Sequence, residues 1–236
     1  MRPLCLTLLL LAAPVLRAEP SITMDSPMWR LASSRDGIAL FNAQVAGTGI
    51  VPVKAVMIIP GSIEEISAVL EDMEHRQDWI DHFGSSALLE RRDDYDQTEY
   101  LRMRMPWPLT DRTALVRVRI TVSPDKRSAT IAASSTELAA AADLFSGVRS
   151  QVYASTFQMT RAGEFTEVAT LAFVDPRGHL PQWVVNYFTS QVARRTLMGL
   201  KRQVERKLYS AQQLDALHRR IEDYQAFAAK AGTPRP

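Results

Sequence analysis

The 236-residue sequence predicts an α+β fold, in which a curved antiparallel sheet of about nine strands is closed over a cavity by a long C-terminal helix. Apolar and polar side chains alternate through most of residues 30–175, which is typical of strands. The turns between these strands are short, which indicates antiparallel pairing. After residue 180 the apolar period becomes that of a helix. A sheet this large curls, and a helix lying across it leaves a concave interior that suits a ligand.

The first half opens with a β-meander followed by a helix. Asp36-Gly37 is a turn signal before a first alternating run, and the apolar residues within 51–59 form the next strand. Ser62 precedes a helical apolar pattern and has Glu65 three residues later, which predicts a capping box at the start of a helix. Residues 74–83 are interpreted as a further short helix or a loop.

A long β-region follows. We expect residues 87–91 to pair with residues 98–105 across a turn at 93–97. In the strand that begins near residue 115, Val116 and Val118 alternate with Arg117 and Arg119. Since successive side chains of a strand point to opposite faces, the valines are predicted to point inward and the arginines outward.

The last third is helical. A helix is predicted from Pro181 or Gln182 to Leu208, and a second helical stretch covers 211–230. The apolar residues of the first helix face two ways: Val185, Phe188 and Val192 come early, and Leu197, Leu200 and Val204 come later. We therefore predict that the N-terminal half contacts ligand and the C-terminal half anchors the helix to the sheet. Ligand would enter past this helix or past the 123–127 turn.

The N-terminus predicts export. Arg2 is followed by an apolar run at 4–15 and by small residues ending at Ala18. This run is too short to span a bilayer but suits a signal peptide cleaved after Ala18. The alternatives are an uncleaved anchor and a buried first helix. Residues 19–28 are interpreted as a flexible leader, and the mature protein is expected in the periplasm or outside the cell.

Cysteine content and charge narrow the possible functions. The only cysteine, Cys5, lies in the signal segment, so the mature chain would contain neither a disulfide nor a free thiol. Without Arg2 and Arg17 the chain has 26 basic and 26 acidic residues and no net charge. A nucleic-acid partner would require a clustered basic excess, so we expect none.

Catalytic and metal-binding patterns are not found in the sequence. His75, His82, His179 and His218 lack the neighbours and spacing of a metal site. There is no Gly-rich phosphate loop after a strand, no Gly-x-Ser-x-Gly elbow and no cysteine nucleophile. We therefore expect no metal, no cofactor and no catalytic residues.

Four segments carry a family resemblance. They are HRQDW at 75–79, EYLRMRMPWPLTDR at 99–112, SGVRS at 146–150 and DPRGHLPQWVVNYF at 175–188. In order and spacing they resemble the START family of lipid-transfer domains, over roughly residues 29–208. The resemblance implies a helix-grip fold that holds one lipid or other apolar molecule. The domain boundaries are then 1–18 for the signal peptide, 19–28 for the leader, 29–208 for the START-like domain and 209–236 for a helical extension.

The resemblance also suggests ligand contacts. Arg76 falls where phospholipid-binding relatives have an arginine near the lipid phosphate; the alternative is a surface salt bridge at a helix end. The chain departs from the family at Ile80, where several relatives have aspartate, and near Val118, where sterol-binding members have a buried arginine. Trp79 and Trp183 are expected to anchor the core. The candidate ligand-binding residues are Arg76, Tyr100, Val118, Arg149, Phe188 and Val192.

Three functions stay open at this point. The favoured one is a non-enzymatic carrier or binder of a lipid or other apolar small molecule, with transient membrane contact. The second is a helix-grip enzyme of the polyketide cyclase or aromatase type, which would place a titratable residue with a shifted pKa inside the cavity. The third is a ligand sensor or an envelope-assembly partner that uses the outer helix at 211–230. The apolar stripe of that helix would pack on the domain, on a membrane or on a second copy.

Overall fold

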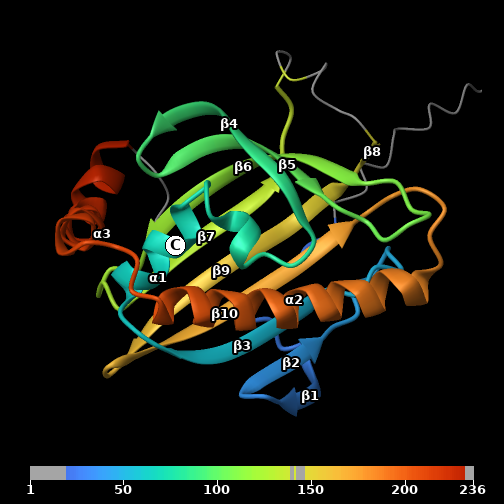
Figure 1. Ribbon diagram of the computed structural model, residues 1–236, viewed down its shortest axis with the longest axis horizontal. Helices are drawn as coiled ribbons and strands as arrows, with labels where there is room; N and C mark the ends of the chain where they lie inside the picture. The colour runs from blue at the N-terminus through green and yellow to red at the C-terminus, as the bar shows by residue number, and fades with distance from the viewer. Residues whose placement is uncertain (1–19, 139–140, 142–146, 232–236) are drawn as a thin grey trace, which may run out of the picture.

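The computed structural model describes residues 20–138, 141 and 147–231 (Figure 1). A large sheet curls around its concave side, and a long helix, α2 (Gln182–Glu205), runs across that side. This is the architecture that the sequence predicts. The expected signal peptide at 1–18, with Cys5, lies outside the described residues, as do residues 232–236.

The sheet has one continuous strand order. From one edge to the other it is β1 (Arg30–Arg35), β2 (Ile38–Asn42), β3 (Val53–Pro60), β10 (Phe165–Asp175), β9 (Gln151–Ala162), β7 (Ser128–Ser135), β6 (Arg112–Val122), β5 (Asp96–Met103) and β4 (Phe83–Asp93). All these neighbours are antiparallel. A two-residue strand, β8 (Val148–Arg149), pairs parallel with the start of β6.

The alternation in β6 is as predicted. Val116 and Val118 are buried on the side of the sheet that faces α2. Arg117 points to the other side, where its Nε donates to Asp96 Oδ1 at 2.8 Å. This face-by-face division fixes the pairing register, because a shift of one residue would bury the arginine and expose the valines.

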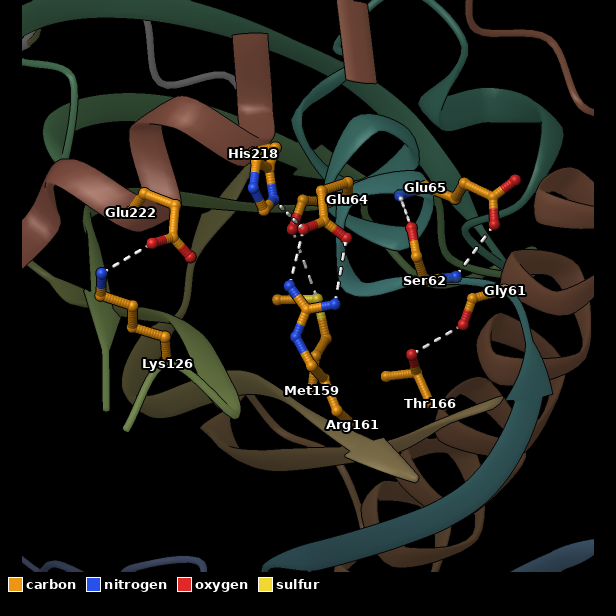
Figure 2. A network of polar contacts seen from close by, with 11 residues as sticks. Gly61, Ser62, Glu64, Glu65, Lys126, Met159, Arg161, Thr166, His218 and Glu222 are labelled. Atoms are coloured by element: carbon orange, nitrogen blue, oxygen red, sulfur yellow. Dashed lines mark hydrogen bonds and ion pairs between the residues drawn. The ribbon is translucent and has the colours of Figure 1, made fainter. Parts of the chain in front are cut away.

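Helix α1 (Ile63–Glu71) begins with the predicted capping box. The Ser62 hydroxyl accepts from the backbone N–H of Glu65 at 3.2 Å, and the Glu65 carboxylate accepts from the N–H of Ser62 at 2.9 Å (Figure 2). The expected further helix is reduced to a single 3-10 turn, η1 (Arg76–Asp78). Phe83, which was placed in that segment, already starts β4.

The C-terminal half of α2 anchors the helix, as predicted. Leu197, Leu200 and Val204 are buried in the main core with residues of α1 and β3. Gly199 permits a close approach, because a Cβ atom there would lie 2.2 Å from the carbonyl oxygen of Trp79. Among the helices that the structure describes, none is both long enough and apolar enough to cross a membrane.

Helix α3 (Ala211–Ala231) packs on its own domain, against α1 and β6. Ile221 and Tyr224 are buried in the main core. Glu64 of α1 accepts hydrogen bonds from Arg161 of β9 and from His218 of α3, at 2.6 and 3.0 Å (Figure 2). Of the three surfaces considered for its apolar stripe, the domain itself is the one occupied.

The expectation of a flexible leader at 19–28 is wrong for residues 20–28. Ile22 is buried against Leu171 and Phe173, on the face of the sheet opposite to α2. The indole Nε1 of Trp29 donates to the carbonyl oxygen of Thr23 at 3.0 Å. Apolar burial therefore holds this segment to the sheet, although its prolines and polar residues are typical of a flexible segment.

Candidate functional site

A cavity of about 280 Å³ lies between the N-terminal half of α2 and the concave face of the sheet. Val184, Phe188 and Val192 of α2 form one wall. The segment after η1 contributes Ile80, and the sheet contributes residues of β5, β6, β7, β9 and β10. This volume is just below the usual range for small-molecule sites, about 300–1,000 Å³, so it suits one ligand of modest size.

The cavity exists because the sheet has small side chains beneath this half of the helix. Ala133, Ser155 and Ala172 are aligned across β7, β9 and β10, and all three line the cavity. Four residues further along, where the C-terminal half of α2 packs, the corresponding inner positions include Met159 and Val168, which fill the core. Side-chain size on one face of the sheet thus divides it into a hollow part and a filled part.

The wall is apolar apart from hydroxyl groups and one charge. Ser150, Ser155 and Thr170 are among the hydroxyl-bearing residues, and Arg112 is the one charged residue among the described lining residues. Within the described parts of the chain, no three potential metal ligands come together. The arrangement can enclose an apolar molecule and offer a few neutral hydrogen-bonding groups and a single cation to its polar part.

Arg112 lies at the start of β6, where two loops meet. Its Nε donates to the carbonyl oxygen of Pro176 at 3.1 Å, and one terminal nitrogen donates to that of Arg177 at 3.2 Å. The other terminal nitrogen donates to the carbonyl oxygen of Thr110. Burial lowers the pKa of the Arg112 guanidinium from its ordinary value, but an arginine stays charged in a protein. Arg112 therefore fixes the entry to α2 and brings a positive charge to the cavity wall.

A buried ion pair lies beyond the apolar wall. Both terminal nitrogens of Arg76 donate to the Glu99 carboxylate, one of them over 3.2 Å to Oε1. The Gln97 amide also donates to Oε1, at 2.6 Å. Glu99 is paired with Val116 on the β5–β6 ladder, and Val116 lines the cavity. The charge of Arg76 is thus already neutralised within the protein.

The sequence matches the family model of the START domain over residues 20–209. The chain belongs to the START domain family. Its fold is that of the solved START structures. A STAR-related lipid transfer protein from Xanthomonas axonopodis has a TM-score of 0.65, with 20% identity, 75% of this chain covered and 99% of that chain. Human StAR-related lipid transfer protein 5 has a TM-score of 0.70, with 16% identity, 79% of this chain covered and 90% of that chain.

One curated relative is similar in sequence. An uncharacterized protein of Pseudomonas aeruginosa is 24% identical over 180 residues, which cover 76% of this chain and 88% of the relative. At these identities the solved neighbours establish the shared fold alone. Together with the cavity, the START fold supports a domain that binds a hydrophobic ligand.

Two of the candidate residues line the cavity of this START domain. Phe188 and Val192 project from α2 into it, as the division of that helix predicts. Arg76 is held by Glu99 outside the described lining residues. The 123–127 turn, one of the two expected entry points, lies beside α3, where Lys126 forms a 2.6 Å ion pair with Glu222 (Figure 2).

The other three candidates lie off the described wall. Val118 continues the inner row of β6 beyond Val116, but it is packed in a core cluster with Val152. Tyr100 alternates with the lining residue Leu101 and belongs to the opposite face of β5. Arg149 donates to the Thr136 carbonyl at 3.1 Å and pairs with Glu137.

The two tryptophans expected in the core differ. Trp79 is buried and contacts Phe157 edge-on, with ring centroids 6.1 Å apart. Trp183 is 73% exposed, so the expectation for it is wrong. Trp183 and Tyr187 are one helical turn apart and share the solvent face of α2, while Val184 and Phe188 face the cavity.

Sequence reasoning missed Arg112 and the small residues of the sheet. In the sequence Arg112 stands out only as the last residue of the segment at 99–112, although an arginine before an apolar alternating run can bring a cation to the edge of a core. Ala133, Ser155 and Ala172 carry a weaker signal, since small residues at inward positions of long strands leave space. This signal indicates a cavity only when the strand register shows that the three residues are neighbours.

Proposed function

We propose that this START domain binds one lipid, or a molecule of similar apolarity, in the cavity beneath α2 and carries it through water. The observation that supports this most directly is the row Ala133, Ser155 and Ala172, which leaves about 280 Å³ of mainly apolar space. Burial of an acyl chain contributes about 0.8 kcal/mol per methylene group. The cavity therefore supplies affinity without specific contacts along the chain of the ligand.

The composition of the wall favours a carrier over a cyclase-type enzyme. A polyketide cyclase or aromatase needs a group that transfers protons at the reacting carbon atoms. The described lining residues include no carboxyl, imidazole, phenol or thiol group. Arg112 stays protonated and cannot act as a general base at neutral pH. The apolar side chains, hydroxyl groups and single cation of this wall are sufficient for binding and transport of a ligand.

The ion pair beyond the wall bears on the orientation of the ligand. The resemblance places Arg76 near a lipid phosphate, but its partner here is Glu99. An anionic group at this end would meet a neutral pair whose charges already satisfy each other. This favours an apolar part of the ligand at the Arg76 end of the cavity.

We also propose that the protein is exported and touches membranes transiently. Export is supported by the N-terminal sequence, and N-terminal sequencing should find the mature chain beginning near Glu19. Membrane contact is supported by Trp107, 93% exposed, and Trp183, 73% exposed. Trp107 lies between β5 and β6, and Trp183 lies in the first turn of α2. Arg112 joins the β5–β6 connection to the segment before α2, and these segments lie at one end of the molecule (Figure 1). Exposed tryptophan is favoured at a membrane–water interface.

A matched pair of variants tests the proposed carrier. Ala133 and Ala132 are neighbours on β7 whose side chains point to opposite faces, and only Ala133 lines the cavity. Lipid extracted from purified mature protein and identified by mass spectrometry should be present in about stoichiometric amount in the wild type and in Ala132→Leu. Ala133→Leu fills the space and should lack it while remaining folded. Absence of lipid from the wild type, or its full retention in Ala133→Leu, would contradict the proposal.

A further inference from the structure

The buried arginines of the described residues are not equivalent. Arg76 is paired with Glu99, and Arg194 of α2 has the Asp36 carboxylate 3.7 Å away. Arg112 is the third, and among the described residues it has no carboxylate within ion-pair distance. A buried charge without a counter-charge is costly, so proteins normally pair it. Of the three, the unpaired one lines the cavity.

The hydrogen bonds of Arg112 leave part of its guanidinium available. The group has five N–H donors, and three of them go to the carbonyl oxygens of Thr110, Pro176 and Arg177. One N–H on each terminal nitrogen is then without an acceptor among the described residues. Carbonyl dipoles orient the side chain, but they leave its net charge unbalanced. Two parallel N–H groups on a planar cation match the geometry of an oxyanion.

Ser150 adds a donor beside Arg112. Its backbone N–H bonds to the Thr113 carbonyl oxygen at 2.8 Å, which holds this residue against the first residues of β6. Ser150 and Val152 are two residues apart and both line the cavity, so the Ser150 side chain is on the inner face. Its hydroxyl is without a hydrogen bond to any other described side chain or backbone group. A ligand atom in the cavity could therefore accept from it.

We propose that Arg112 and Ser150 bind the oxyanion head group, a carboxylate or a phosphate monoester, of a single-chain amphiphile. The tail would lie over the small residues of the sheet, toward Phe157, and away from the Arg112 loops. This inference depends on the proposed function, because it names the ligand class of the same cavity. It also explains the asymmetry of charge: the Arg76 end is neutralised internally, and the Arg112 end receives its counter-charge from the ligand.

Three ligands with the same dodecyl chain test this on the wild-type mature protein. They are dodecanoic acid, dodecyl phosphate and 1-dodecanol, with affinities measured by calorimetry at a pH well above the pKa of a carboxylic acid. At least one of the two oxyanions should bind about tenfold or more tightly than the alcohol. The tighter of the two identifies the head group. Equal affinity for all three would overturn this inference and leave the proposed carrier intact, whereas no binding of any of them would contradict both.

Variants locate the effect. Arg112→Gln should bring the affinity for the oxyanion down to that for the alcohol and leave the alcohol itself unchanged. Arg104→Gln is the control, since Arg104 is an exposed cation of the neighbouring loop outside the described wall. Ser150→Ala leaves the loop contacts of Arg112 in place and should weaken oxyanion binding alone, by roughly fivefold. A preference for the oxyanion that survives in folded Arg112→Gln would overturn the assignment; if Arg112→Gln does not fold, a preference that Ser150→Ala leaves as large as in the wild type would overturn it.

Discussion

The two halves of α2 lie on the same sheet but meet different surfaces. The C-terminal half inserts Leu197 and Leu200 into a filled core, and both side chains are inaccessible to solvent. The N-terminal half lies over a cavity and presents Phe188 and Val192 to it. The helix is apolar on its inner side in both halves, so the difference arises from the size of the sheet residues beneath. Stability and ligand binding are therefore separated along one element, and substitutions can address each of them.

The largest expected effect on stability comes from breaking the filled half. Leu200→Ala should lower the free energy of unfolding by about 2–5 kcal/mol, because it removes a buried side chain from a core that cannot collapse fully. Val192→Ala deletes atoms that already border empty space, so it should cost less than about 1 kcal/mol. Urea unfolding of the ligand-free proteins measures both values.

Lipid affinity should show the opposite order. Val192→Ala removes a surface that contacts ligand, so it should weaken binding by several-fold, while Leu200→Ala should bind normally below its unfolding temperature. Equal losses of stability for the two variants would show that the N-terminal half is packed as tightly as the other. The division of α2 into an anchor and a cavity wall would then be wrong.

The filled half is also the part that the sequence predicts best. The Ser62–Glu65 capping box and the apolar stripe from Leu197 to Val204 are local patterns with direct physical causes. Each of them survives in the structure because tertiary packing agrees with local preference.

The cavity half was predicted only in outline. The position of Phe188 and Val192 follows from the two apolar directions of the helix, but the neutralisation of Arg76 by Glu99 depends on two segments that lie 23 residues apart. The exposure of Trp183 was missed because composition favours burial of an aromatic ring. Strand register and long-range contacts decide whether a residue lines the cavity, forms an ion pair or lies on the surface. A single sequence does not contain this information directly.

The pH dependence of stability offers a second way to sharpen the comparison, because a carboxyl group with a strongly lowered pKa, that of Glu64, packs beside the filled half. Burial by itself would raise the pKa of the Glu64 carboxyl. Hydrogen bonds from Arg161 and His218 outweigh this effect and lower the pKa to about 2 (Figure 2). An unfolded glutamate titrates near 4.5. The lowered pKa means that Glu64 contributes stability above about pH 4.5 and loses it as the pH falls toward 2. The contribution is on the order of 3 kcal/mol.

Glu64→Gln isolates this contribution. The variant should be less stable than the wild type at neutral pH, and the difference should shrink as the pH falls through the range between 4.5 and 2. Chemical unfolding at a series of pH values measures it. Because the network joins α1, β9 and α3, lipid affinity at neutral pH should stay the same in folded Glu64→Gln. A constant difference in stability across this pH range would mean that the hydrogen bonds do not lower the pKa of Glu64.

The smallest expected effect on stability belongs to the surface of the cavity half. Trp183 is 73% exposed on the solvent face of α2, so Trp183→Ser should change the free energy of unfolding by less than about 0.5 kcal/mol. Trp183 is five residues from Phe188 in sequence but outside the cavity wall, so equilibrium affinity for lipid should also stay unchanged. If this end of the molecule meets membranes, the loss of an interfacial indole should instead slow lipid transfer between two populations of vesicles, by several-fold.

Leu31→Ser is the matched control, because Leu31 is 61% exposed on the edge strand β1, away from the loops at Arg112. A transfer rate that falls equally in both variants, or in neither, would show that Trp183 does not contribute to membrane contact. The cavity half would then serve ligand binding alone.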